Sequence, residues 1–331
     1  MATIAVTVRA ITPSNLHNLN RLTDAGHEIR LVPCLPTIAR ADLAHNLQGA
    51  YAVIAGSEPY TTDVFDLAPD LRHIARFGVG FDAIDTNAAT AHGVAVSITP
   101  GSNASAVADL AFGLLLSIAR GIPNDDRAVR TGTWRATTGA DVFGATLGII
   151  GLGRIGQRMA RRGRGFDMKL ISYDPFPDRA FVEEYGVELM EMDEVFARAD
   201  FVTLHAPSDE ETRHLVNAKR LARMKSTAYL INCARGGLVD EDALYDALKN
   251  RRIAGAGLDV RKVEPTVSDR FAELDNVILT PHSAASTFGA MIKAAEMSAD
   301  AILASLSGQQ PVGLINTDGW QAFLDARSAR V

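Results

Sequence analysis

A glycine-rich turn that follows an apolar run constrains this chain more than any other feature. Residues 147–150 lead directly into Gly151, Gly153 and Gly156, in the spacing G-x-G-x-x-G. In a dinucleotide-binding turn the first glycine permits a tight change from strand to helix, the second lets a pyrophosphate approach the backbone, and the third lets the helix pack against the strand. Asp174 stands eighteen positions after the last glycine, at the end of a second apolar run, where it can bond ribose hydroxyls.

The helix that this turn opens supplies the remaining part of such a site. Its unpaired N–H groups and its dipole favour a negative charge at the N-terminus, where the pyrophosphate would lie. The residues directly after Asp174, at 175–177, include no arginine that could pair with a 2′-phosphate. The motif therefore predicts NAD as the cofactor.

Length and composition exclude several other classes of protein. The chain has 331 residues, which suggests two domains, and its 47% hydrophobic content is ample for two cores. Its net charge of −6 is spread without long blocks, so no nucleic-acid partner is expected. The densest basic run falls on the helix after the glycine turn and is interpreted as a solvated helix face; it comprises Arg158, Arg161, Arg162 and Arg164.

Cysteine usage and hydropathy indicate the compartment. The two cysteines, Cys34 and Cys233, are far apart in sequence and lack metal-ligand spacing, so we expect neither a disulfide framework nor a metal site. The N-terminus has no basic head and reads as a first strand. The longest apolar stretch, at 104–119, contains Asp109 and is too short to span a bilayer. A cytoplasmic protein without a membrane partner is predicted.

Strand-like and helix-like segments alternate on both sides of the glycine turn. Alternation of this kind gives mostly parallel sheets with helices on both faces, the α/β class. The expected strands are at 4–8, 28–32, 52–55, 73–76 and 94–98, then at 147–150, 169–173, 201–204, 228–232, 256–259 and 277–280. Helices are expected at 14–25, 83–91, 104–119 and 284–306. Because the last helix follows the final strand of the second series, we expect it to return to the first domain and make that domain discontinuous.

Three charged or titratable side chains follow successive strands of the second series. Ligands of open α/β sheets bind beyond the carboxyl ends of the strands, so these side chains should gather beside the cofactor. Arg235 can hold a carboxylate as a fork and polarise a ketone, while His282 can supply a proton and Glu264 can stabilise the imidazolium. Taken singly, each would be read as a turn or capping residue. Together they predict reduction of a carbonyl next to a carboxylate.

The motifs that surround these residues resemble those of the D-2-hydroxyacid dehydrogenase family, and within it phosphoglycerate dehydrogenases without a regulatory C-terminal domain. The resemblance covers about the last three quarters of the chain in the family's order. The matching motifs are residues 76–82, 151–156, 204–207 with Thr212, 232–240, 257–260 with Glu264 and Pro265, and 280–283.

The resemblance implies a role for each matching position. It makes Arg235, Glu264 and His282 the catalytic set. It assigns the cofactor site to Gly151, Gly153, Arg154, Ile155, Gly156, Asp174, His205, Ala206, Pro207, Thr212, Cys233, Ala234, Asp259, Ser283 and Ala284. It assigns the substrate site to Ser57, Arg76, Phe77, Gly78, Val79 and Gly80, with the backbone at 78–80 gripping the substrate carboxylate. The substrate would be 3-phosphoglycerate, hydroxypyruvate or glyoxylate, or their oxidised or reduced partners.

Three departures from the family pattern bear on the substrate. Arg261 stands where an aromatic residue is common, and Ala284 begins a pair that is often two glycines. Gly56 stands where phosphoglycerate dehydrogenases tend to carry an arginine, although Arg76 remains as a phosphate contact. A phosphorylated substrate is therefore disfavoured without being excluded.

We predict two doubly wound parallel-sheet domains, with a Rossmann NAD-binding domain at 101–284 inserted in a flavodoxin-like substrate-binding domain at 1–100 and 285–331. The helix at 103–119 and the arm that carries Trp134 are more apolar than a monomer surface should be. The resemblance suggests a homodimer through that element.

Two other functions remain open at this point. One is a phosphite-type oxidoreductase of the same fold, and the other is a corepressor-like protein that senses dinucleotides and binds partners. A formate enzyme is disfavoured because Glu264 stands where such enzymes carry glutamine.

Overall fold

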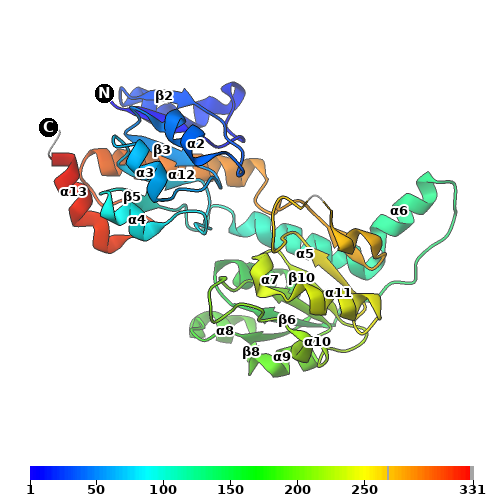
Figure 1. Ribbon diagram of the computed structural model, residues 1–331. Coiled ribbons are helices and arrows are strands. Elements are labelled where there is room, and N and C mark those ends of the chain that lie inside the picture. Colours follow the sequence, from blue (N-terminus) through cyan, green and yellow to red (C-terminus); the bar gives the residue numbers. More distant parts are fainter. Residues whose placement is uncertain (267, 329–331) are drawn as a thin grey trace. The chain divides into compact units, whose positions relative to one another are not determined.

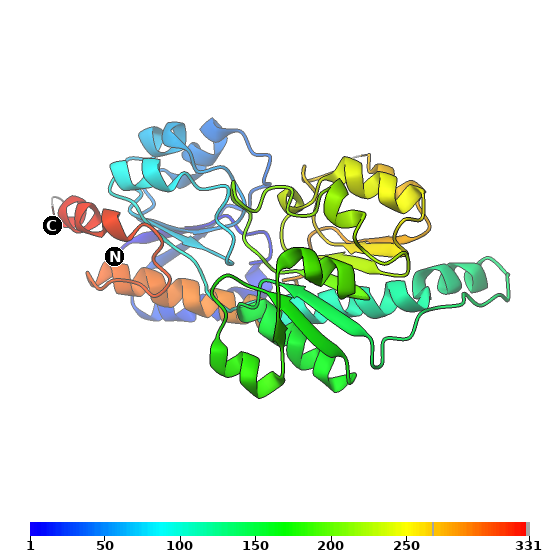
Figure 2. The ribbon, with the colours of Figure 1, turned by 90° about the horizontal axis from the view of Figure 1, so that it is seen from below.

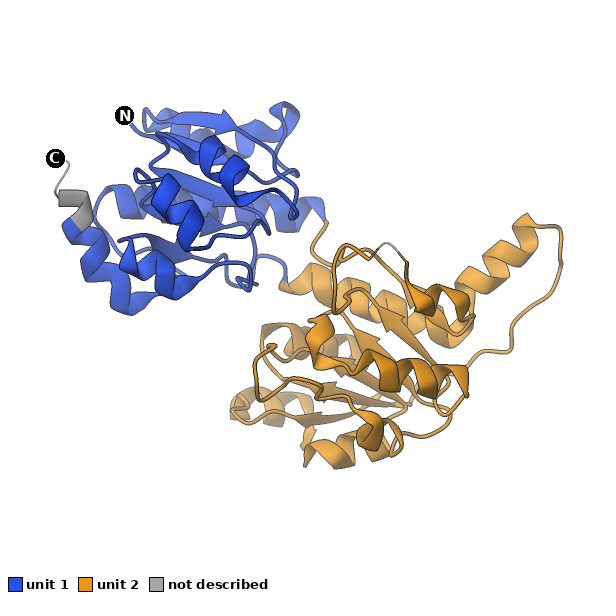
Figure 3. Cartoon of the chain, in the orientation of Figure 1, with its two compact units in different colours: residues 1–103, 287–331 blue, residues 104–286 orange. Residues whose placement is uncertain are grey.

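The chain divides into two compact units (Figures 1 and 3). The structure is a computed structural model that describes residues 1–266 and 268–328. Unit 1 comprises Met1–Asn103 and the described part of Thr287–Val331, and unit 2 comprises Ala104–Ser286. The limits expected from sequence, at residues 100 and 284, lie three and two residues before these.

Unit 1 is built on a five-stranded parallel sheet in the order β2-β1-β3-β4-β5. This is the flavodoxin-like order, in which the direction of winding reverses between β1 and β3. The strands are β1 (Thr3–Val6), β2 (Glu28–Leu31), β3 (Ala52–Ala55), β4 (His73–Arg76) and β5 (Ala95–Ser97). The helices are η1 (Pro13–Leu19), α1 (Asn20–Asp24), α2 (Arg40–Leu47), α3 (Thr62–Leu67), α4 (Thr86–Ala91), α12 (Phe288–Leu306), η4 (Thr317–Gly319) and α13 (Trp320–Ser328).

Helices cover both faces of this sheet. Leu43 of α2 and Phe65 of α3 belong to the core on one face. Leu22 of α1 and Ile302 of α12 belong to the core on the other. The chain therefore closes the fold of unit 1 only after it has completed unit 2, because α12 supplies part of the second core.

Unit 2 is built on a seven-stranded parallel sheet in the order β12-β11-β10-β9-β6-β7-β8. Read from β6, this is the Rossmann order with one added strand. The strands are β6 (Thr146–Ile150), β7 (Lys169–Tyr173), β8 (Glu188–Leu189), β9 (Phe201–Leu204), β10 (Tyr229–Asn232), β11 (Gly255–Leu258) and β12 (Val277–Leu279). The helices are α5 (Ala104–Arg120), α6 (Ile122–Arg130), α7 (Arg154–Gly165), α8 (Arg179–Tyr185), α9 (Met192–Arg198), α10 (Ala218–Leu221), η2 (Gly236–Leu238), α11 (Glu241–Lys249) and η3 (Arg270–Glu273).

Helices α5, α7 and α8 contribute to the core on one face of this sheet, and α9, α10 and α11 to the core on the other. Helix α6 has no buried residue and projects from the body of unit 2 together with the segment that follows it (Figures 1 and 2). Within the described residues no single helix is long and apolar enough to cross a membrane, although α5 and α6, bent by 63° to each other, meet that test as a pair.

The predicted strands agree with the structure, but several helix limits were wrong. The last long helix begins at Phe288, not at residue 284, because Thr287 caps it by accepting a hydrogen bond from Ala290 N at 3.2 Å. The segment expected as one helix at 14–25 is a 3-10 turn that starts at Pro13 and continues into α1. Helix α4 starts at Thr86 since Asp85 is its N-cap. Strand β8 was not predicted, and neither were helices α2, α3, α6, α8, α9, α10, α11 and α13.

Candidate active site

The side chains predicted to act in unit 2 follow the carboxyl ends of its strands. Because every strand pair of this sheet is parallel, these ends lie along one edge. The glycine turn follows β6, Asp174 follows β7 and His205 follows β9. The loops of Arg235, Glu264 and His282 follow β10, β11 and β12 in turn.

The glycine turn has the shape that a bound pyrophosphate requires. Gly151 has φ +91°, a backbone conformation that side chains rarely adopt. A Cβ on Gly156 would lie 2.0 Å from the carbonyl oxygen of Gly151, so α7 can pack this closely only with glycine there. A Cβ on Gly153 would meet no atom within 4 Å, which leaves the N-terminus of α7 open beside Arg154 and Ile155. These residues fit a dinucleotide.

Two hydrogen bonds from backbone N–H groups hold the carboxylate of Asp174 beside the glycine turn. Its Oδ2 accepts a hydrogen bond from Leu152 N at 2.6 Å, and its Oδ1 accepts one from Phe176 N at 2.7 Å. The carboxylate is thereby held between the turn and the end of β7. A carboxylate in this place fits the ribose of a dinucleotide.

The loop after β9 packs directly on the glycine turn. His205 N donates to Ile150 O at 2.7 Å, and a Cβ on Gly151 would lie 2.8 Å from the His205 carbonyl carbon. Burial lowers the pKa of His205 to about 3, so its ring is neutral, and Nε2 lies 2.9 Å from Thr203 Oγ1. Thr212 Oγ1 donates to Pro207 O at 2.9 Å and closes the loop that also contains Ala206.

His282 and Glu264 form a close pair. His282 Nδ1 lies 2.6 Å from Glu264 Oε2, and the two side chains are 47% and 33% exposed. Burial raises the pKa of Glu264, but the hydrogen bond with His282, the Arg261 N–H and the charges of His282 and Arg235 outweigh it and lower that pKa overall. His282 has φ +52°, and such strained backbone is common at functional sites.

Arg235 lies within electrostatic reach of Glu264, since its charge lowers the pKa of that carboxyl. The loop that carries it is shaped by buried Asn232, whose Nδ2 donates to Arg235 O at 2.9 Å and whose Oδ1 accepts from Ala234 N at 3.0 Å. Sequence reasoning gave Asn232 no role. A polar residue at the last position of an otherwise buried strand was the signal that it shapes the loop.

Asp259 holds the turn that carries His282. Its carboxylate is buried and accepts hydrogen bonds from Thr280 Oγ1 at 2.6 Å, Ser283 N at 2.8 Å and Ala284 N at 3.0 Å. His282 N donates to the Asp259 carbonyl at 2.8 Å. Contacts of Asp259, Ser283 and Ala284 with the cofactor stay predictions.

Cys233 directly follows β10 and precedes Ala234. It is buried, and burial raises the pKa of its thiol far above the usual range, so the thiolate is strongly disfavoured. A backbone contact with the cofactor stays a prediction for Cys233 and Ala234.

Arg261 braces the loop that carries Glu264, a role that sequence reasoning missed. Its N–H donates to Glu264 Oε1 at 2.7 Å, and its Nε donates to Asp269 Oδ2 at 2.6 Å. A Cβ on Gly236 would lie 2.0 Å from the Arg261 carbonyl carbon, so the loops after β10 and β11 touch there. The unusual arginine at this position was the available signal.

The predicted substrate residues lie in unit 1, after β3 and β4. Ser57 follows β3, and Arg76 ends β4 ahead of Phe77, Gly78, Val79 and Gly80. Arg76 turns back on this loop: its Nε donates to Gly80 O at 2.8 Å, and its Nη1 donates to Phe77 O. The guanidinium thus holds two carbonyls of the loop that was predicted to bind the substrate carboxylate.

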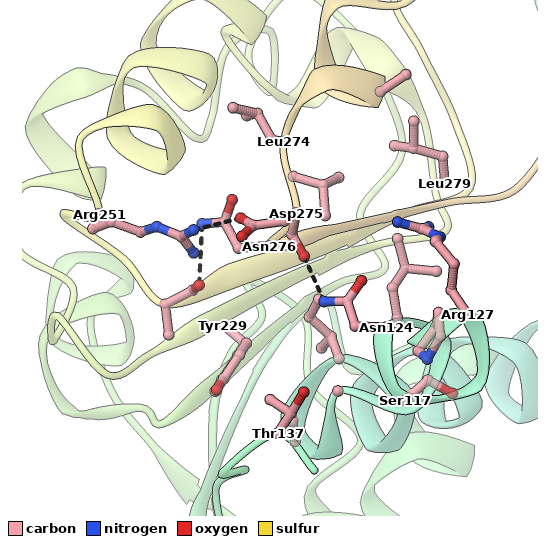
Figure 4. Close-up of a pocket in the computed structure, with 18 of the residues that line it drawn as sticks. Ser117, Asn124, Arg127, Thr137, Tyr229, Arg251, Leu274, Asp275, Asn276 and Leu279 are labelled. Atoms are coloured by element: carbon pink, nitrogen blue, oxygen red, sulfur yellow. Dashed lines mark hydrogen bonds and ion pairs between the residues drawn. The ribbon is translucent and has the colours of Figure 1, made fainter. Parts of the chain in front are cut away.

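A cavity of about 600 Å³ in unit 2 lies away from the candidate site residues of that unit (Figure 4). It lies at the amino ends of the strands, where Tyr229 begins β10 and Val277 begins β12. Arg251 pairs with Asp275 there, and Asn124 Nδ2 donates to Asp275 O at 2.9 Å. No group of three or more His, Cys, Asp or Glu side chains able to hold a metal occurs in the described part of the chain.

The fold of unit 2 and the residues that follow the carboxyl ends of its strands are those of a dinucleotide-dependent oxidoreductase. Comparisons with known proteins identify the family within that class. Residues 112–284 match the family model described as the D-isomer specific 2-hydroxyacid dehydrogenase, NAD binding domain. The chain therefore belongs to the D-2-hydroxyacid dehydrogenase family, and it is an NAD-dependent enzyme.

Individual relatives agree with this assignment. A glyoxylate reductase of Korarchaeum cryptofilum is 43% identical over 269 residues, which are 79% of this chain and 81% of that protein. A D-3-phosphoglycerate dehydrogenase of Methanocaldococcus jannaschii is 40% identical over 293 residues, which are 87% of this chain but only 56% of that longer protein. The crystal structure of the TT0316 protein from Thermus thermophilus superposes with a TM-score of 0.86 at 34% identity, covering 95% of this chain and 99% of that one.

Proposed function

We propose that the protein interconverts a D-2-hydroxy acid and its 2-keto acid, with His282 and Glu264 as the acid–base pair. The observation that carries the proposal is the 2.6 Å contact between His282 Nδ1 and Glu264 Oε2 at the edge of an NAD-binding sheet. A carboxylate on Nδ1 leaves Nε2 to exchange a proton with the substrate oxygen.

Arg235 binds the substrate carboxylate and polarises its ketone. A guanidinium presents paired donors in a plane, which suits a carboxylate beside a carbonyl. The cofactor, when bound, supplies or accepts the hydride at the carbon atom. In reduction His282 gives a proton to the oxygen as the hydride arrives, and in oxidation it removes that proton.

The substrate class is the short 2-keto acids, and the candidates within it are glyoxylate, hydroxypyruvate and 3-phosphohydroxypyruvate. In this proposal the backbone N–H groups at Gly78–Gly80 receive the substrate carboxylate in unit 1. The fold of that loop supports the assignment, since Arg76 holds the carbonyls of Phe77 and Gly80.

NADH consumption with a panel of 2-keto acids tests the proposal. The panel contains glyoxylate, hydroxypyruvate, 3-phosphohydroxypyruvate and pyruvate, with NAD-linked oxidation of phosphite measured beside it. We expect reduction of at least one keto acid and no oxidation of phosphite. Oxidation of phosphite alone would favour the phosphite-type alternative, and NADH binding without any turnover would favour the dinucleotide-sensing one.

We also infer a homodimer through α5 and the arm that follows it. Helix α6 has no buried residue, and the Trp134 side chain is 92% exposed. Ile122 and Val129 of α6 are also exposed, at 52% and 51%. Exposed apolar side chains gathered on one projecting element support association. Analytical ultracentrifugation of the wild type and of Trp134→Ser tests this, because the substitution should shift the protein toward monomer.

A further inference from the structure

The carboxyl edge of the sheet in unit 1 contains a buried acid that the proposed function does not use. Glu58 follows β3 and is 2% exposed. Its Oε2 accepts a hydrogen bond from Thr7 Oγ1 at 3.0 Å and lies 3.5 Å from the hydroxyl of fully buried Tyr60. Thr7 follows β1, so the acid lies where the winding of the sheet reverses, the place at which ligands of such sheets bind.

The Glu58 carboxylate occupies the space beside Gly56. A Cβ on Gly56 would lie 2.5 Å from Glu58 Oε1, closer than such atoms approach in proteins. No side chain can therefore project from position 56 while Glu58 keeps this place. The position of the Glu58 carboxylate therefore requires a glycine at position 56.

Positive charge near this acid is scarce. The loops after β3, β4 and β5, at 56–61, 77–85 and 98–103, contain no lysine or arginine, and the loop after β1 contains one cation, the exposed Arg9. Arg76, at the end of β4, donates to the carbonyls of Phe77 and Gly80. Burial raises the pKa of Glu58, and the Thr7 hydrogen bond and the Arg76 charge oppose that effect in part. A phosphate group at this edge would meet a carboxylate where it needs a cation.

We propose that Glu58 is a specificity-determining residue that rejects phosphorylated substrates, so that the enzyme acts on unphosphorylated short 2-keto acids. The inference rests on the proposed function, because it takes the loops after β3 and β4 as the substrate site. Like charges brought together in a partly desolvated site repel each other strongly, and such repulsion is a common source of specificity. The acid acts by its charge, since it is too buried to touch the substrate side chain.

The test compares hydroxypyruvate with 3-phosphohydroxypyruvate, which differ by the phosphate. The wild type is expected to prefer hydroxypyruvate in kcat/KM with NADH. Glu58→Gln keeps the shape of the side chain and removes its charge, and it should reduce that preference at least about tenfold. Glu58→Ala should change the preference in the same direction, so the test survives a folding defect in either variant.

Thr7→Val is the matched control. It removes the hydroxyl that bonds Glu58 and leaves the carboxyl group. Because loss of that bond raises the pKa of Glu58 further, all variants are compared at the same alkaline pH, where the preference of Thr7→Val should stay near the wild-type value. A wild type that prefers 3-phosphohydroxypyruvate, or a preference unchanged in both Glu58 variants, would overturn the role of Glu58 and leave the proposed function standing. An equal loss of preference in Thr7→Val would overturn it too, since loosening alone would then suffice. Reduction of neither keto acid, nor of glyoxylate, by the wild type would overturn the proposed function and this inference with it.

Discussion

Both units place a glutamate at the carboxyl edge of a parallel sheet, but the two acids differ in surroundings. Glu264 in unit 2 is one-third exposed and pairs with His282, and its pKa is lowered. Glu58 in unit 1 is buried among hydroxyl groups, and its pKa is raised chiefly by burial. The comparison teaches that the position in the fold does not decide what an acid does. Exposure and the nearest partner decide it.

The largest expected effect concerns the exposed pair. His282→Ala removes the proton donor, and general acid–base catalysis of this kind contributes about 10²- to 10⁴-fold. We expect kcat for keto-acid reduction to fall on that scale, while the Kd for NADH changes little because the glycine turn and Asp174 are intact. Steady-state kinetics and NADH fluorescence titration measure the two quantities. A variant whose kcat stays within a few-fold of the wild-type value would show that His282 is not the proton donor.

Arg235→Lys should have the next largest effect. An ammonium keeps the charge but cannot present the paired donors of a guanidinium, and loss of a preorganised donor costs about 2–4 kcal/mol of transition-state stabilisation. That corresponds to a fall of roughly 30- to 1,000-fold in kcat/KM. Arg251→Lys, which changes an exposed arginine paired with Asp275, is the control and should retain activity. Equal kinetics of the two variants would reduce Arg235 to a turn residue.

Glu264→Gln sharpens the comparison through the pH dependence. The lowered pKa of Glu264 means that it is ionised throughout the neutral range. In the proposed mechanism reduction takes its proton from His282, so kcat/KM should fall as pH rises, and a carboxylate on Nδ1 favours the protonated ring. In the variant the alkaline limb should therefore move to lower pH. Glu273→Gln, an exposed acid of the same unit, should leave the profile unchanged, and an unshifted profile in Glu264→Gln would separate that acid from His282.

The sequence predicted the parts of this molecule that depend on local pattern. Alternating apolar runs located every strand of both sheets except β8, and the glycine spacing located the turn where Gly151 and Gly156 meet. The close contact of His282 with Glu264 was inferred from their places after neighbouring strands.

What the sequence did not predict depends on contacts between distant segments. The sequence around Glu58 contains no signal that this acid is buried against Thr7, which is distant in sequence. The limits of α12 depend on the Thr287 cap and on the turn that Asp259 holds. Arg261 was recognised as unusual, but its bond to Asp269 and its N–H to Glu264 appear only in the folded loop.

The smallest expected effect is on stability and arises from a buried histidine of unit 1. His73 is fully buried, with Nδ1 2.8 Å from Ser305 Oγ and Nε2 2.8 Å from Ser97 Oγ, and burial lowers its pKa to about 3. Its ordinary value is 6.5, so between pH 6.5 and about 3 the unfolded chain binds the proton that the folded unit does not. The contribution of neutral, buried His73 to the stability of unit 1 is therefore complete above pH 6.5 and declines as pH falls, by at most about 1.4 kcal/mol per pH unit.

His73→Gln, which cannot take up that proton, should flatten this dependence of stability on pH. Hydrogen exchange of peptides from β4 and α12 between pH 7 and 5, corrected for the intrinsic exchange rate, measures the change. Peptides from β9 are the internal control, since His205 of unit 2, whose pKa burial also lowers to about 3, is unchanged in the variant. An equal pH dependence of β4 in the wild type and in His73→Gln would show that the buried histidine does not link protonation to the stability of unit 1.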